Sequence, residues 1–152
     1  MTAPTEQLVT RGDFVFCVPA PWQPASHGWI GPGDGLQLVV TAERIPRASG
    51  ELGLCVRKYA VGRLAAATKD VKGSKMGTPS YEESDALVFA SCSAFLGDGF
   101  MGVTVAGHAC SATEYALLSV VVIRDGETDP ADETSRALAE IVESIQPKSA
   151  QH

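Results

Sequence analysis

Two apolar runs joined by a Gly-Asp-Gly turn constrain the fold more than any other feature of the chain. Residues 86–96 (ALVFASCSAFL) and 100–108 (FMGVTVAGH) flank GDG at 97–99. Asp-Gly between apolar runs is a strong signal for a β-hairpin. A further run at 114–126 is apolar on both faces, which predicts a strand that is central or covered on both sides. We therefore expect an antiparallel sheet at the centre of the fold.

The N-terminal third contains two more strand-like segments. Phe14, Phe16 and Val18 recur at the two-residue period of a strand, so they share one face. Prolines follow Val18 closely, and because proline has no amide hydrogen we expect them to end the hydrogen-bond ladder. After a turn at 31–35 (GPGDG), residues 36–45 (LQLVVTAERI) predict another strand.

Two other segments have helical periodicity. We expect a helix over about 50–66, with Ser49 as its N-cap, because an apolar stripe recurs at helical spacing. The stripe comprises Leu52, Cys55, Val56 and Tyr59. The last predicted helix starts at Asp129 and Pro130, which suit the cap and the first helical position, and Pro147 ends it. Its buried stripe would comprise Leu138, Ile141, Val142 and Ile145.

The order of these elements predicts the fold class. The strands occur in hairpins rather than alternating with helices, and the polar segment 69–85 is expected to be a long loop. We predict an α+β fold with a mostly antiparallel sheet of about five or six strands and two main helices packed on it. We expect the 152 residues to form a single domain, 1–152, with an ordered core at about 8–147.

Charge and hydropathy restrict the classes of partner. The formal net charge is −6, and because an acidic surface repels phosphate backbones, we expect no nucleic-acid partner. Solubility explains this charge as well as a basic partner does. The longest apolar run, YALLSVVVI, is too short to span a bilayer, so we expect no membrane insertion.

The cysteines and the first residues indicate a cellular location. Cys17, Cys55, Cys92 and Cys110 form no Cys-x-x-Cys pair and have apolar neighbours in sequence. The start, MTAPTEQLVTRGD, lacks the positive region and apolar run of a signal peptide. An even number of cysteines permits two disulfides, but we expect reduced thiols and a cytoplasmic protein.

Motifs for catalysis and metal binding are sparse. No His-Glu-x-x-His or cysteine–histidine spacing indicates a zinc site, although Cys92, Cys110 and His108 could converge in space. On one strand Cys110 and His108 would lie about 7 Å apart, too far for a nucleophile to bond its base. The glycine-rich 31–35 lacks a phosphate-binding fingerprint. We predict no catalytic residue, no metal ligand and no cofactor, and a protein that is not an enzyme.

The segment CVPAPWQPASHGW, residues 17–29, poses the question of where a partner binds. Tryptophan is frequent in binding hot spots, so Trp29 and the nearby His27 are candidate partner-binding residues. We expect Trp22 to plug one end of the core, and Trp29 to be either an exposed anchor or a core residue. The predicted partner surface is the sheet face away from the helices. Charged contacts would come from Glu82, Glu83 and Asp85 in the long loop.

The element order and two short motifs resemble a known fold family. The chain runs from FVFCVPAPW through LQLVVTAERIP and the GDG turn to SRALAEIVESIQP. Over about residues 10–147 this pattern resembles the DcrB-like proteins, whose fold is shared with the photosystem subunit PsbP and a Ran-binding import factor. The strand that leads into Val18, Pro19 and Trp22 is the most recognisable piece, and the closing ESIQP is the second.

The resemblance implies a PsbP-like fold that serves as a non-enzymatic binding scaffold. One branch, the effector-associated chaperones of bacterial type VI secretion, shields apolar transmembrane segments of effectors in a cleft beside the sheet. Immunity proteins, which block the active site of a toxin, occur in the same setting. We therefore expect a cytoplasmic, bacterial protein-binding module whose partner is a toxin or a secreted effector. An immunity protein is the leading hypothesis, and the oligomeric state is left open.

Three alternatives remain beside the immunity protein. The first is an effector-associated chaperone, although strands rich in Ala, Ser and Cys argue against a large apolar client groove. The second is a small-molecule or lipid carrier that uses a cavity between the helix 50–66 and the sheet. The third is an enzyme that relies on Cys110 or His108.

Overall fold

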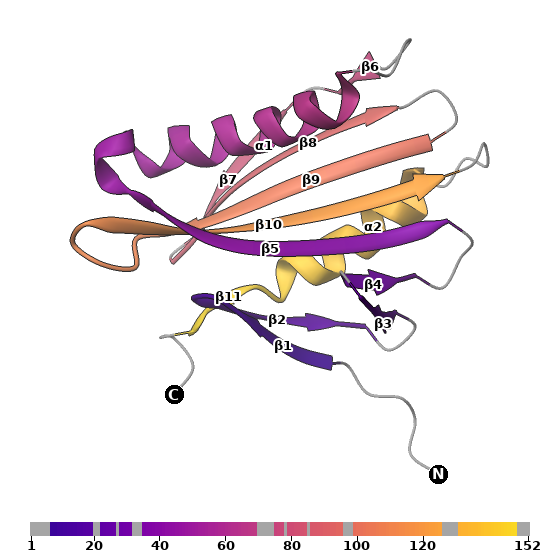
Figure 1. Cartoon of the computed structure of the whole chain (residues 1–152), viewed down its shortest axis with the longest axis horizontal. Helices are drawn as coiled ribbons and strands as arrows, with labels where there is room; N and C mark the ends of the chain where they lie inside the picture. Colours follow the sequence, from indigo (N-terminus) through magenta and orange to yellow (C-terminus); the bar gives the residue numbers. More distant parts are fainter. Residues whose placement is uncertain are drawn as a thin grey trace.

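Over the residues that the structure describes, the fold consists of one large sheet, one small sheet and two helices, arranged in layers (Figure 1). The structure is a computed structural model of the chain. It describes residues 7–148 except for 20–21, 27, 32–34, 70–74, 78, 85, 96–98 and 126–130. Its elements are β1 (Gln7–Arg11), β2 (Phe14–Val18), β3 (Gln23–Ala25), β4 (Gly28–Ile30), β5 (Leu36–Pro46), a 3₁₀ turn (Arg47–Ser49), α1 (Leu52–Thr68), β6 (Lys75–Met76), β7 (Ser80–Glu83), β8 (Val88–Phe95), β9 (Gly99–His108), β10 (Glu114–Asp125), α2 (Ala131–Glu143) and β11 (Gln146–Pro147).

Within the described part of the chain, the large sheet has eight antiparallel strands in the order β3-β4-β5-β10-β9-β8-β6, with β7 also paired to β8. The small sheet has the order β1-β2-β11. The predicted α+β class, the antiparallel sheet and the two main helices are therefore confirmed. The predicted five or six strands are too few, because β3, β4, β6 and β11 have only two or three residues each. Such short segments cannot display a two-residue period.

The segment expected to be a long loop, 69–85, includes two strands at the edge of the sheet. Lys75 and Met76 of β6 pair with the end of β8, and β7 pairs with its beginning, Tyr81 opposite Ala90. The polar composition of this segment predicted a loop, but an edge strand is also polar because it exposes its side chains to water. Three of the four residues of β7 are exposed, and only Tyr81 is partly buried.

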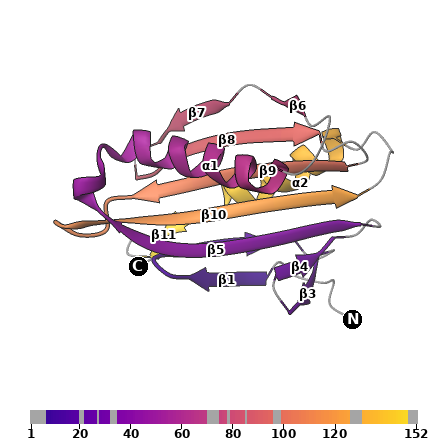
Figure 2. The same ribbon diagram turned by 45° about the horizontal axis from the view of Figure 1, so that its top comes forward.

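The two helices lie on opposite faces of the large sheet (Figures 1 and 2). α1 packs on β8 and β9, while α2 and the small sheet cover the other face. The long central strand β10 is buried on both faces, with Leu117 toward α1 and Leu118 toward the small sheet. The expected free sheet face is therefore wrong, because each face has its own cover over the described part of the chain.

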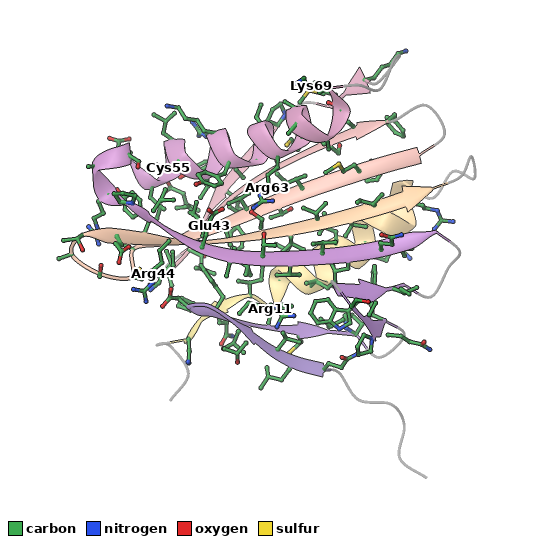
Figure 3. All side chains as sticks on the ribbon, viewed as in Figure 1. Arg11, Glu43, Arg44, Cys55, Arg63 and Lys69 are labelled. Atoms are coloured by element: carbon green, nitrogen blue, oxygen red, sulfur yellow. The ribbon has the colours of Figure 1, made fainter. Side chains whose placement is uncertain are left out.

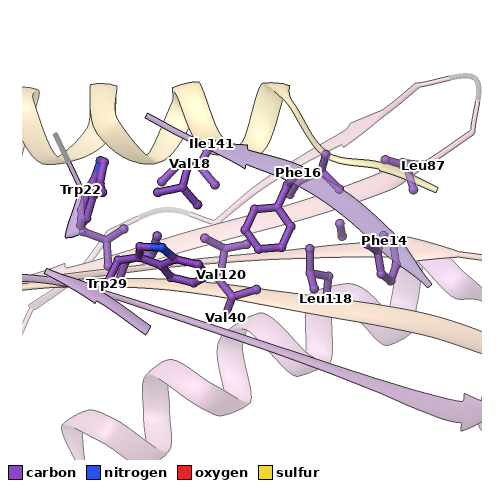
Figure 4. Close-up of a cluster of buried hydrophobic side chains, with 14 of the residues drawn as sticks. Phe14, Phe16, Val18, Trp22, Trp29, Val40, Leu87, Leu118, Val120 and Ile141 are labelled. Atoms are coloured by element: carbon purple, nitrogen blue, oxygen red, sulfur yellow. The ribbon is translucent and has the colours of Figure 1, made fainter. Parts of the chain in front are cut away.

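The core on the α2 side is built from aromatic and large aliphatic side chains (Figure 4). Phe16 and Trp29 meet edge to face, with ring centroids 6.1 Å apart, a favoured geometry for aromatic pairs. Phe14, Phe16 and Val18 are fully buried, as the alternation in the sequence predicted. The large residues of this layer include Phe14, Phe16, Trp22, Trp29, Leu38, Leu118 and Ile141.

The core on the α1 side is made of smaller residues. Cys55, Ala60 and Leu64 of α1 face Ala90, Cys92 and Ala94 of β8 and the valines of β9. Gly107 on β9 allows the close approach of α1, since a Cβ atom there would lie only 2.6 Å from Cγ1 of Val56. Cys55 and Val56 of the predicted stripe are buried, and Leu52 and Tyr59 pack at its edge.

Both helices differ from prediction at their ends. α1 begins at Leu52 with Glu51 as N-cap, and the expected cap Ser49 lies in the preceding 3₁₀ turn instead. α2 ends at Glu143, and Pro147, expected to end that helix, lies in β11 opposite Phe14. The predicted cap of α2, Asp129 with Pro130, lies outside the described residues.

Candidate functional site

A run of small side chains on β8 leaves a hollow on each face of the sheet. The residues are Ala90, Ser91, Cys92, Ser93 and Ala94. Because they fill little volume, neighbouring side chains on α1 and α2 do not close the space beside them. We call the hollow on the α2 side the α2 groove and the one on the α1 side the α1 groove. Ser80 and Ser91 line both, so the β7–β8 edge is flanked by the two.

The α2 groove has a volume of about 320 Å³, at the lower end for ligand sites. Its floor carries the hydroxyl groups of Ser91, Ser93 and Thr104. The hydroxyl oxygens of Ser91 and Thr104 are 2.8 Å apart and share one hydrogen bond. Thr104 is only 2% exposed, so this polar pair is held within the sheet at the base of the groove. The pair keeps unused acceptor lone pairs, because each hydroxyl can accept two hydrogen bonds.

The wall of the α2 groove is apolar and comes mainly from α2. Leu138 and Val142 face the sheet, and Phe100 closes the end near the β8–β9 turn. Gly102 keeps the floor low, since a Cβ atom there would lie 3.3 Å from Cδ2 of Leu138. The groove therefore combines an apolar wall with a hydroxyl-rich floor, as binding sites with a few directing polar groups do.

Two carboxylates line the α2 groove, one from each side. Glu82 comes from β7 and Glu143 from the last residue of α2. Neither forms an ion pair with a described residue, and the described residues that line the groove include no lysine or arginine. The groove is therefore negatively charged as well as open to solvent.

The α1 groove, of about 350 Å³, is more apolar. It lies between α1 and β7, with Ala60, Val61 and Ala90 among its lining residues. The guanidinium of Arg57 stacks over the ring of Tyr81, 4.0 Å from its centroid. Burial, and then the hydrogen bond from its hydroxyl to Glu83 at 2.9 Å, raise the pKa of Tyr81.

The predicted acidic contact residues fall in different places. Glu82 lines the α2 groove, while Glu83, the next residue on β7, belongs to the α1 side through its contact with Tyr81. Successive side chains of a strand point to opposite faces, so these two neighbours cannot serve one site. Asp85 and His27 lie outside the described residues. Of the predicted acidic contact residues that the structure describes, only Glu82 therefore lies at the α2 groove.

Trp29 is a core residue, which corrects its expected alternative role as an exposed anchor. It is 6% exposed and sits under β1, where its indole nitrogen donates to Oε1 of Gln7 at 3.2 Å. Arg11 lies over its ring, 5.4 Å from the centroid. Trp22 is 2% exposed and plugs the same end of the core, as predicted. β4 pairs with β5, which turns Trp29 toward β2, where its ring meets that of Phe16.

The cysteines and His108 are not brought together in the structure. Cys92 packs in the core on the α1 side, whereas Cys110 packs against the core on the α2 side. Burial raises the pKa of the Cys92 thiol, which disfavours the reactive thiolate. His108 Nδ1 lies 3.3 Å from the carbonyl of Ala86. The suggested convergence of Cys92, Cys110 and His108 is wrong, since the sheet separates the two thiols.

Ion pairs link β5 to the layers on both sides of the large sheet (Figure 3). Arg44 donates to both carboxylate oxygens of Asp13, at 2.9 and 2.7 Å. This hydrogen bonding lowers the pKa of Asp13. The preceding residue, Glu43, lies 3.5 Å from Arg63 of α1. These exposed contacts connect elements and form no enclosed site.

Sequence reasoning missed the hydroxyl floor and the α2 wall of the groove. The signal was present in the alternation of β8, where Ser91 and Ser93 alternate with Ala90, Cys92 and Ala94. One face of a strand expected to be buried was thus polar. What the sequence could not indicate is that Glu143, about fifty residues later, lines the same hollow.

Comparison with known proteins supports the fold. The sequence matches no protein-family model and no curated protein at a significant level. A solved structure that resembles the chain is the solution structure of cyanobacterial PsbP (CyanoP) from Synechocystis sp. PCC 6803, with a TM-score of 0.60 at 12% sequence identity. The match covers 96% of this chain and 94% of that chain. Neither helix, over the residues described, combines the length and apolar character needed to cross a membrane. The match to cyanobacterial PsbP over almost the whole of both chains shows that this chain has a PsbP-like fold, as the resemblance in sequence implied.

Proposed function

We propose that the protein is a non-enzymatic binding module that holds a segment of a partner protein in the α2 groove. The observation that carries the proposal is the lining of this groove: an apolar wall, a floor of hydroxyl groups and two carboxylates without an ion-pair partner among the described residues. Such a lining recognises and orients a polar segment. In its specific form, the module is a cytoplasmic immunity protein of a bacterial secretion system that neutralises a toxin effector.

The size and charge of the groove favour an immunity protein over an effector chaperone. A transmembrane helix of about 20 residues is about 30 Å long and needs an extended apolar cover. A hollow of about 320 Å³ with Glu82 and Glu143 in its lining is too small and too polar for that client. The net charge of −6 fits a basic partner, which electrostatic attraction would steer toward the chain.

The proposal is tested with the full chain and the products of the neighbouring genes. The tagged protein is co-expressed with each product, complexes are isolated by size-exclusion chromatography, and affinity is measured by calorimetry. We expect one toxin or effector to bind and to lose its toxicity in the complex. A chain that binds none of these products contradicts the proposed function.

A matched pair of tryptophan substitutions locates the interface. Ser93→Trp fills the α2 groove, and we expect it to weaken partner binding about thirtyfold or more. Ala66→Trp adds the same side chain at an exposed position on α1 and should leave affinity unchanged. Circular dichroism checks that both variants fold. Lost binding with Ala66→Trp but not with Ser93→Trp would move the interface to α1 and overturn the groove assignment.

The α1 groove supports a second candidate function, a small-molecule or lipid carrier. Its lining is mostly apolar, and Arg57 at its edge could meet an anionic head group. Native mass spectrometry of the purified protein should then reveal a bound compound. Val61→Trp, which would fill this groove, should remove that mass. A protein that shows no added mass, even after incubation with lipid extract, contradicts the carrier function.

A further inference from the structure

The polar groups of the α2 groove are rich in hydrogen-bond acceptors. Ser91 and Thr104 share one hydrogen bond, which leaves one hydroxyl hydrogen and several lone pairs for a ligand. Glu82 and Glu143 add carboxylates that only accept when ionised. A ligand that carries many donors and a positive charge would satisfy this set, whereas an anionic ligand would be repelled.

The end of α2 strengthens the same preference for a cation. Glu143 is the last residue of the helix, where the backbone carbonyls place the negative end of the helix dipole. A carboxylate is unfavourable at that position, and the last turn contains no basic residue to offset it. A positive group bound in the groove would interact with both the carboxylate and the helix end. At this end of the groove a cationic group is therefore favoured over an anionic one.

The apolar wall defines the shape of the cation. Leu138 and Val142 lie beside the acceptor groups, so a ligand that fits has a charged tip on an aliphatic stem. Arginine has this form, with five N–H donors, no acceptor and a flexible methylene chain. Its planar guanidinium also pairs with carboxylates through two parallel hydrogen bonds.

We propose that the α2 groove is an anchor site for an arginine side chain of the partner protein, with the guanidinium at Glu82 and Glu143. The methylene groups of that arginine lie against Leu138 and Val142. This inference rests on the proposed function, because it names the chemistry of the segment that the groove holds. It makes the complex sensitive to salt, since part of its affinity is electrostatic.

A pair of short peptides tests the arginine directly. The probes are acetyl-Ala-Arg-Leu-amide and the same peptide with citrulline, which keeps the shape of arginine but has no charge. Each is titrated into the ¹⁵N-labelled full chain, and amide shifts are followed by NMR. We expect the arginine peptide to bind about tenfold more tightly than the citrulline peptide and to shift the amides of Ser91, Ser93 and Thr104. Equal affinity of the two peptides, or no shift at millimolar concentration, overturns the inference.

Each groove carboxylate has a matched control on its own element. Glu82→Gln and Glu143→Gln should each weaken the arginine peptide about three- to tenfold. Glu83→Gln and Glu140→Gln make the same change in net charge on β7 and α2 outside the groove, and should leave affinity within about twofold. Equal losses in both pairs would mean that only the overall charge attracts the peptide, which contradicts an anchor site.

The two proposals fail in different ways. If the peptides do not discriminate charge but Ser93→Trp still abolishes partner binding, the groove binds a partner without an arginine anchor. If the arginine peptide binds as expected but no neighbouring gene product forms a complex, the anchor site stands and the immunity function is wrong.

Discussion

The two faces of the large sheet are packed with side chains of different size, and this contrast accounts for the two grooves. The α2 side has an aromatic layer centred on Phe16 and Trp29, under the small sheet. The α1 side has a layer made mainly of alanine, cysteine and valine, on which one helix packs closely. Large side chains fill space between distant elements, while small ones allow elements to approach. Beside β8 the side chains are too small to fill the space and the helices do not approach closely enough to close it, so a hollow remains on each face.

The contrast teaches that the two layers should tolerate opposite kinds of substitution. The aromatic layer depends on volume, so removal of atoms leaves a cavity. The α1 layer depends on the close approach of α1 to β8 and β9, so added atoms force this helix away from the sheet. The predictions below test this contrast, beginning with the largest expected effect.

Phe16→Ala should destabilise the protein by about 3–5 kcal/mol, because it removes a fully buried ring that contacts Trp29 at the centre of the aromatic layer. Urea unfolding followed by tryptophan fluorescence measures the loss. Leu8→Ala, at a side chain that is 66% exposed on β1, is the control and should change stability by less than about 0.5 kcal/mol. A loss below about 1 kcal/mol for Phe16→Ala would mean that this layer does not depend on volume.

Gly107→Ala should destabilise the protein by about 1–3 kcal/mol despite adding only one methyl group. The new Cβ atom would lie 2.6 Å from Cγ1 of Val56 and 2.8 Å from Cδ1 of Leu52. Val56 is fully buried and has a stiff, branched side chain, so it cannot move aside easily. Thermal unfolding by circular dichroism measures the change, and an unchanged midpoint would show that the α1 layer can expand.

Gly62→Ala, the same substitution on the exposed side of α1, should stabilise the protein by about 0.5–1 kcal/mol. Apart from the neighbouring residues and backbone of α1 itself, no atom of the described residues lies within 4 Å of a Cβ at this position, so only the gain in helix propensity remains. The opposite signs expected at Gly107 and Gly62 are the sharpest test of close packing under α1. A destabilised Gly62→Ala variant would reveal a contact of the outer helix face that the isolated chain does not explain.

The smallest effect concerns the ion pair between the two sheets. The hydrogen bonds from Arg44 lower the folded-state pKa of Asp13, so this contact stabilises the fold above the unfolded value of about 3.9. The contribution is lost as the pH falls through the lowered pKa. An NMR titration should therefore find that Asp13 titrates below its ordinary range, and nearer to it in Arg44→Gln.

Glu43→Gln provides the control for this titration. It removes the neighbouring pair with Arg63 on the other face of the sheet and should leave the Asp13 titration unchanged. If Arg44→Gln does not move the pKa of Asp13, the contact between the small and large sheets is not maintained in solution.

Periodicity in the sequence was sufficient to predict the long elements and their buried faces. Phe14, Phe16 and Val18 alternate in β2, and the run at 114–126 is apolar on both faces of the central strand β10. These patterns are local, because each depends only on neighbours within one element. The antiparallel α+β class followed from them, whereas the PsbP-like fold was implied by the resemblance to a known family and is supported by the structural match.

The tertiary structure alone decided which elements share a face and what lies beside them. β4 and β7 are too short to be recognised by periodicity, yet pairing with β5 buries Trp29, and pairing with β8 separates Glu82 from Glu83. Likewise, nothing local connects Glu143 with Glu82, and only the return of α2 across the sheet brings both to one groove. A groove is formed by side chains distant in sequence that fail to fill the space between them. The sequence therefore determined the long strands and helices and their buried residues, while long-range pairing determined how the layers stack and where the site lies.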